Sequence, residues 1–100
     1  MPTKAEITSS IAKELRIVTH LTCKLEDRHL DFRFTPAQRS TRELLQYLAV
    51  AAEGAVRFLL TGTRDGDELR RKAASNLSLS DFPHVFATQI QTVESLIEPL

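Results

Sequence analysis

The sequence predicts an all-α protein, an up-and-down helical bundle of three long helices and one short helix. Apolar residues recur every three or four positions, the spacing of one face of an α-helix, in three long stretches, residues 3–25, 40–62 and 80–98. Each stretch begins with a residue that is favoured at a helix N-cap, namely Thr3, Ser40 and Ser80. The alternating apolar residues before Pro36 have no partner strand elsewhere, so no sheet is expected.

The stretch from Ser40 to Gly62 is predicted to be the central helix of the bundle. Ser40 followed three residues later by Glu43 is a capping box, and Gly62 is suited to the left-handed cap that ends a helix. Two apolar stripes lie side by side on this helix, which therefore needs neighbours on more than one side. The stripes are Leu44, Leu48, Ala51, Ala55 and Leu59, and Leu45, Ala49, Ala52, Val56 and Leu60.

The two other long helices carry one main apolar stripe each, and we expect them to run antiparallel to their neighbours. The first starts at a capping box of Thr3 and Glu6, and the last tolerates Pro83 because this proline lies in its first turn. Their stripes are Ile7, Ile11, Leu15, Val18, Leu21 and Leu25, and Phe82, Phe86, Ile90, Val93 and Ile97.

Two segments connect the long helices. Residues 26–39 are predicted to be an extended connector, in which Phe32 and Phe34 pack across the end of the bundle. After Gly62, a turn leads into a short helix from Glu68 to Ala74, for which Asp67 is the expected cap.

The composition is that of one soluble domain, to which we assign residues 1–100. The 13 Lys and Arg balance the 13 Asp and Glu, so no net charge attracts the chain to nucleic acid or to an anionic membrane. Gln46, Glu53 and Arg57 interrupt the most apolar helix, which argues against a membrane span. Cys23 is the only cysteine, and the amino terminus lacks a secretory pattern, so a cytoplasmic protein is expected.

The short helix does not complete a set of four long ones. One face of the helix at 40–62 is then left open, and a homodimer is the expected way to cover it. Two alternatives stay open. The chain is the N-terminal part of a longer domain, or the short helix and the connector cover the face themselves.

Two segments of the sequence carry a resemblance to a known family, the runs LEDRHLDFRFTPAQRSTRELLQYLAVAAEGAVRFLLTG and LSDFPHVFATQIQTVESL. They resemble the first three helices of the DinB-like superfamily, the damage-inducible or YfiT-like proteins. The family pattern is an extended segment that ends in a proline-containing turn, followed by a helix that starts at serine and carries a Leu-Leu-x-His-Leu core. The positions that fit it are Ser40, Glu43, Leu44, Leu45 and Leu48.

The resemblance implies a four-helix bundle, often dimeric, in which many members bind a divalent metal through three histidines. The position of the first histidine is occupied here by Tyr47, and the sequence ends before the region of the other two. The resemblance therefore implies the scaffold with its metal site lost, and a vestigial pocket made of Gln46, Tyr47 and Glu53.

The other candidate residues have simpler interpretations. His20, His29 and His84 are expected to be solvated, although His20 and His84 are the candidates for a composite metal site. Cys23 is expected to be a half-buried, inert thiol. Glu53 and Arg57 have the spacing of an ion pair on one helix, and an exposed strip is favoured over a buried carboxylate. The basic run at residues 70–72 is interpreted as a solvated helix end.

Two functional hypotheses follow. The first is a non-catalytic DinB-like protein without a cofactor, which acts through self-association or protein interaction. The alternative is a metal-dependent transferase or hydrolase of the same superfamily, with zinc or nickel. The first is favoured because metal catalysis needs about three converging ligands with an open position, and the sequence shows no such set.

Overall fold

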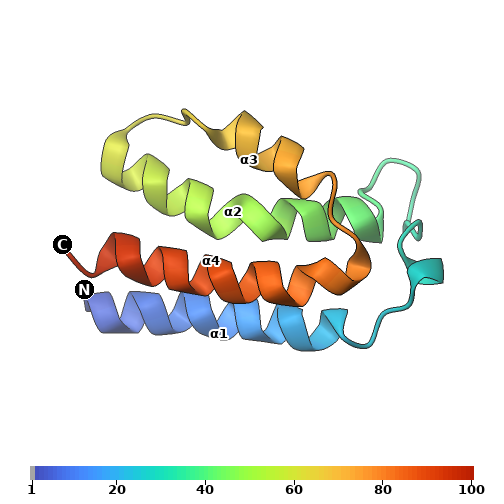
Figure 1. The fold of residues 1–100 in the computed structure, drawn as a ribbon, viewed down its shortest axis with the longest axis horizontal. Helices are drawn as coiled ribbons and strands as arrows, with labels where there is room; N and C mark the ends of the chain where they lie inside the picture. Colours follow the sequence, from blue (N-terminus) through green and yellow to red (C-terminus); the bar gives the residue numbers. More distant parts are fainter. Residues whose placement is uncertain (1) are drawn as a thin grey trace.

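The computed structural model describes residues 2–100, and these residues contain helices and no strand (Figure 1). The α-helices are α1 (Lys4–Thr22), α2 (Thr41–Thr61), α3 (Asp67–Ala74) and α4 (Phe82–Ile97). Two short 3-10 turns, η1 (Asp27–His29) and η2 (Leu79–Asp81), lie in the connections before α2 and α4. The prediction of an all-α fold with three long helices and a short one is confirmed.

Helix α4 lies at the centre of the molecule, between α1 and α2, and α3 packs on α2 (Figure 1). The prediction that α2 is the central helix was therefore wrong. The sequence of α4 explains the difference, because Glu94 is its only charged residue, so it can pack against neighbours on two sides. Helix α2 carries four charged side chains, Arg42, Glu43, Glu53 and Arg57.

The direction of the helices also differs from the prediction. Helix α3 carries the chain back along α2, so α4 starts at the same end of the molecule as α2 and runs parallel to it (Figure 1). Only α1 is antiparallel to α4 among the long helices. Although α3 is short, it fills the third position of the up-and-down order.

The core is built around two stacked aromatic rings of α4. The centroids of Phe82 and Phe86 lie 5.9 Å apart, and both side chains are fully buried. The rest of this cluster comes from α1, the connector, α2 and α3, as Leu15, Leu30, Leu45, Ala49 and Ala74. A second cluster of Val56, Val93 and Ile97 joins α2 to the C-terminal half of α4.

The connector is anchored by a residue other than the predicted ones. Leu30 is buried in the core, whereas Phe32 and Phe34 are exposed, Phe34 by 86%. The two rings pack edge to face against each other, with centroids 5.3 Å apart. The prediction that they cross the end of the bundle was wrong, because Leu30 already fills that place.

The helix ends follow the predicted chemistry at three of five positions. Capping boxes are present at Thr3 and Ser40, and Gly62 has the left-handed conformation, with φ 77°. The other two caps were assigned wrongly. Helix α3 starts at Asp67 itself, after the left-handed Gly66, and Ser80 lies inside η2.

The start of α4 and the end of α1 also differ from the predicted boundaries. Asp81 is the N-cap of α4, and its carboxylate accepts a hydrogen bond from the Ser78 amide at 2.8 Å, so Ser78 caps the preceding η2 turn. Helix α1 ends at Thr22, three residues before the predicted Leu25. Cys23 therefore lies beyond the helix and is exposed, not half-buried as predicted.

Helix α2 is the one helix in residues 2–100 that is long and apolar enough, by length and composition, to cross a membrane. Only 22% of its most apolar 18-residue window is buried inside the structure. The buried part is the stripe that contains Leu45, Ala49 and Val56. The other predicted stripe is largely exposed, and α3 covers only its flank.

Candidate functional site

A cleft of about 480 Å³ lies between α2 and α3. Its floor is formed by one face of α2, with Tyr47, Val50, Ala51, Gly54 and Ala55. Its walls are charged, with four guanidinium groups and two carboxylates, from Arg39, Arg64, Arg70, Arg71, Glu43 and Asp67. Two of the residues predicted to form the vestigial pocket, Gln46 and Tyr47, line this cleft.

Helix α3 approaches α2 closely at Gly54. This glycine is buried, and a Cβ atom at its position would lie 3.4 Å from Asp67 Oδ1. The Asp67 carboxylate therefore lies directly over the α2 backbone. From there it accepts a hydrogen bond from Arg70 Nη2 at 2.6 Å and pairs with Arg64 Nη1 at 3.5 Å.

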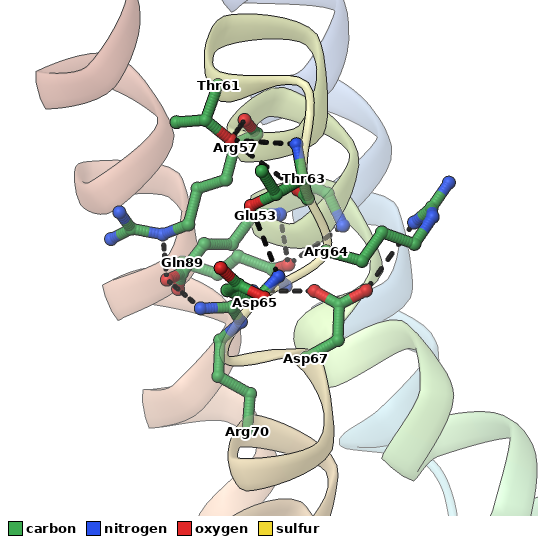
Figure 2. A network of polar contacts seen from close by, with 10 residues as sticks. Glu53, Arg57, Thr61, Thr63, Arg64, Asp65, Asp67, Arg70 and Gln89 are labelled. Carbon is green, nitrogen blue, oxygen red and sulfur yellow. Dashed lines mark hydrogen bonds and ion pairs between the residues drawn. The ribbon is translucent and has the colours of Figure 1, made fainter.

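A network of ion pairs continues from α3 to the middle of α2 (Figure 2). Arg70 Nη1 lies 3.8 Å from Glu53 Oε2, which also accepts a hydrogen bond from Arg57 Nε at 2.7 Å. The predicted Glu53–Arg57 pair is thus confirmed. The prediction that Glu53 lies on an exposed strip was wrong, because α3 folds over Glu53 and leaves its side chain 20% exposed. Arg70 is half-buried for the same reason, although Arg71 and Lys72 are solvated as predicted.

Gln89 of α4 joins this network from the core side (Figure 2). Its side chain is 3% exposed. The amide oxygen accepts hydrogen bonds from the backbone N–H groups of Ala52 and Glu53 at 3.0 and 3.1 Å, and the amide nitrogen donates to the Leu48 carbonyl at 2.9 Å. One buried side chain of α4 thus makes hydrogen bonds to three backbone groups of α2 and holds the two helices together.

The structure divides the predicted vestigial pocket into two parts. Gln46 and Tyr47 line the cleft, whereas Glu53 lies in a second groove of about 360 Å³ between α2, α3 and α4, which His84 also lines. Arg70 contributes to both. The Tyr47 ring is covered by the guanidinium of Arg39, whose central carbon lies 4.2 Å from the ring centroid, a cation–π contact.

The histidines are placed on different elements. His20 is near the end of α1 and His84 is in the first turn of α4, and both are exposed. His29 Nδ1 accepts a hydrogen bond from the Glu26 amide at 2.9 Å. In the described part of the chain, no three His, Cys, Asp or Glu side chains converge in a way that could hold a metal ion.

Two carboxylates that line the cleft, Asp67 and Glu43, are stabilised in their charged form. Hydrogen bonding from Arg70, followed by that from Arg64, lowers the pKa of Asp67 in spite of its partial burial. Hydrogen bonds from the Ser40 backbone and hydroxyl, and then from Arg33, lower the pKa of Glu43. The carboxyl groups of Asp67 and Glu43 therefore stay ionised to a lower pH than free carboxyl groups do.

We predict that the Asp67–Arg70 pair makes stability depend on pH. Because the pKa of Asp67 is lower in the folded chain than in the unfolded one, the contribution is complete above the unfolded value near about 3.9 and disappears as pH falls through the folded value. Asp67→Asn should lose stability near neutrality and show a smaller decrease in melting temperature on acidification. Thermal unfolding followed by circular dichroism at several pH values measures this.

The matched control for that experiment is Asp27→Asn, which removes an exposed carboxylate that forms no ion pair within residues 2–100. Its pH dependence should follow that of the unmodified chain. An Asp67→Asn curve with the same acid decrease as the unmodified chain would contradict the prediction.

No family model, curated protein or solved structure matches this chain. The resemblance to DinB-like proteins thus stays a prediction, and the function has to be inferred from the chain's own surfaces.

Proposed function

We propose that the chain is a non-catalytic helical module without a cofactor, which acts by self-association of two copies through α2. The observation that carries this proposal is an apolar stripe along the face of α2 that the other helices leave largely uncovered. It consists of Leu44, Tyr47, Ala51, Ala55, Phe58 and Leu59, and is called the α2 stripe below. Leu59 is 82% exposed, and Leu44 and Tyr47 are exposed by 45% and 47%.

The size and continuity of the α2 stripe support an interface. Its residues recur at helical spacing over four turns of α2, so they form one continuous face. Soluble monomers rarely expose a contiguous apolar patch of this kind, whereas single exposed apolar residues are ordinary.

The order of residues along the α2 stripe fits a second copy of the same chain. Small side chains, Ala51 and Ala55, occupy its middle, and large ones occupy both ends. In an antiparallel pair related by a two-fold axis between Ala51 and Ala55, the alanines face each other and let the helices approach closely. Leu44 and Tyr47 of one copy then meet Phe58 and Leu59 of the other, which is a self-complementary interface.

Charge along the α3 side of the α2 stripe fits the same arrangement. Arg39 and Glu43 lie at the N-terminal end of the α2 stripe, and Arg64 and Asp65 lie at its C-terminal end. Antiparallel pairing places opposite signs together, Glu43 opposite Arg64 and Arg39 opposite Asp65. Complementary charges of this kind fix the register of an interface more than they add affinity.

The same surroundings argue against metal chemistry at the position of Tyr47. Arg39 covers the ring, and Arg71 lines the same cleft. A divalent cation held beside these guanidinium groups would be repelled. The proposed history is that of a DinB-like scaffold whose metal position became part of an interface.

Sedimentation equilibrium tests the proposal. The unmodified chain should be a dimer at about 10 µM, and Ala55→Glu should be a monomer, because it buries two carboxylates near the two-fold axis. A dissociation constant raised at least about 100-fold is expected, a cost of about 2.7 kcal/mol. Ala87→Glu, which adds the same charge at an exposed position of α4, is the matched control and should stay dimeric.

Circular dichroism of each variant establishes that the helices are retained. A monomer at all concentrations for the unmodified chain would refute self-association. A dimer that Ala55→Glu leaves intact would place the interface on another surface.

A further inference from the structure

The cleft between α2 and α3 holds more positive charge than its own carboxylates neutralise. Asp67 is shared by Arg64 and Arg70. Glu43 is bound by Arg33 Nη2 at 2.6 Å, and Arg33 lies outside the cleft lining. Two cations of the lining, Arg39 and Arg71, form no ion pair with any residue in the described range 2–100.

This excess is local, because the chain as a whole is neutral, with 13 basic and 13 acidic residues. The unpaired guanidinium groups come from two separate elements, Arg39 from the turn before α2 and Arg71 from α3. The fold, and not a run in the sequence, brings them to one cleft. Such convergent guanidinium groups are the usual protein ligands of carboxylates and phosphates.

A second observation points to a missing acceptor. The Nε–H group of Arg70 is buried and has no hydrogen-bond partner among the described residues. Buried donors in proteins are nearly always paired, so an unpaired one in the wall of a cleft calls for an explanation. Because Arg70 lines the cleft, an anion bound there is one source of the acceptor.

The floor of the cleft is apolar where the walls are charged. Tyr47 presents an aromatic ring, and Ala51 and Ala55 extend the surface along α2. The cleft volume of about 480 Å³ lies in the range of small-molecule sites, roughly 300–1,000 Å³. A charged wall beside a flat apolar floor suits a ligand with one anionic group and one ring.

We infer that the cleft binds a small aromatic anion, a compound with a phosphate or carboxylate group on a planar ring. Arg39 and Arg71 bind the anionic group, and the ring lies on the floor beside Tyr47. This site goes beyond self-association. Arg39 and Arg71 are outside the α2 stripe, but Tyr47, Ala51 and Ala55 belong to both surfaces, so the ligand and a second copy of the chain compete for the floor of the cleft.

Isothermal titration at low ionic strength, with phenyl phosphate and inorganic phosphate as probes, tests the inference. Phenyl phosphate should bind one site per chain and at least about tenfold more tightly than inorganic phosphate, because the ring adds buried apolar area. Arg71→Gln and Arg39→Gln should each weaken phenyl phosphate about tenfold through the lost charge-assisted hydrogen bonds.

The matched control is Lys72→Gln, which removes the same charge from the next residue of α3, outside the cleft lining. It should leave the affinity unchanged within about twofold, since only a general charge effect remains. Equal weakening by Lys72→Gln and Arg71→Gln would show non-specific attraction and overturn the inference. Absence of saturable phenyl phosphate binding would overturn the inference as well. Equal affinities for phenyl phosphate and inorganic phosphate would show that the apolar floor does not bind the ring.

The same samples, examined by sedimentation equilibrium with and without phenyl phosphate, separate this inference from the proposed dimer. A monomer that binds phenyl phosphate through Arg71 would refute self-association and support the cleft. Because both use Tyr47, Ala51 and Ala55, phenyl phosphate should shift a dimer toward monomer, and a dimer whose dissociation constant it leaves unchanged would refute the cleft and support self-association.

Discussion

Phe86→Ala is expected to lower the free energy of unfolding by about 3–5 kcal/mol, the cost of truncating a buried phenylalanine to alanine in a core. Phe86 is fully buried on α4 and stacks on Phe82. It belongs to the cluster that joins α4 to Leu15 of α1 and Leu45 of α2. Since α4 holds the other two long helices together, the resulting cavity lies where all three meet.

Urea unfolding followed by circular dichroism measures this change. A domain of about 100 residues has only about 5–15 kcal/mol of total stability, so Phe86→Ala should shift the midpoint strongly or unfold the chain at room temperature. Leu69→Ala on the exposed side of α3 is the control and should change stability by less than about 0.5 kcal/mol. A loss below about 1 kcal/mol for Phe86→Ala would contradict the central position of α4.

Gln89→Leu is expected to lower the free energy of unfolding by about 1–3 kcal/mol, although leucine is a similar size and more apolar. The reason is that the amide of Gln89 serves Leu48, Ala52 and Glu53 of α2. Leucine would remove all three hydrogen bonds at a position that is 3% exposed. Burying a polar group unpaired costs more than the added apolar surface returns.

The matched control is Gln91→Leu, two residues further along the same helix, because Gln91 is exposed. It should be close to neutral in the same urea titration. Amide hydrogen exchange at Ala52 and Glu53 should become faster in Gln89→Leu only. A Gln89→Leu variant at least as stable as the unmodified chain would show that α2 satisfies its own backbone there without α4.

The features predicted correctly from the sequence are those set by neighbours in the chain. Capping boxes at Thr3 and Ser40 depend on two residues three positions apart, and the Glu53–Arg57 pair depends on two residues one helical turn apart. Such interactions are encoded locally, so their spacing predicts them.

The arrangement of the helices depends on comparisons between distant segments, and there the prediction was wrong. The two stripes of α2 indicated a central helix, but only the stripe with Leu45 and Val56 is buried. The near absence of charge from α4 was the better signal for the centre. In the connector, alternation drew attention to Phe32 and Phe34, whereas Leu30 is the residue that reaches the core.

The candidate site could be predicted only in part for the same reason. Gln46 and Tyr47 do line the cleft, yet the partners that give it its charge, Arg39 and Arg71, come from other segments. The contact of Arg70 with Glu53 needs α3 to fold back along α2. Gln89 did leave a signal in the sequence, since it is a polar residue three positions after Phe86 and four before Val93, on the buried face of α4.

Disulfide trapping of single-cysteine variants tests the central claim, antiparallel pairing through α2, most directly. In a Cys23→Ser background, mixed chains of Ala51→Cys and Ala55→Cys place the two thiols opposite each other across the two-fold axis, within disulfide reach, a Cα separation of about 4.4–6.8 Å. Leu59→Cys lies at the end of the α2 stripe, far from its own copy. Under mild oxidation, non-reducing electrophoresis should show covalent dimers for the mixture and monomers for Leu59→Cys. Covalent dimers of Leu59→Cys that form as fast as those of the mixture, or none in the mixture, would contradict the account.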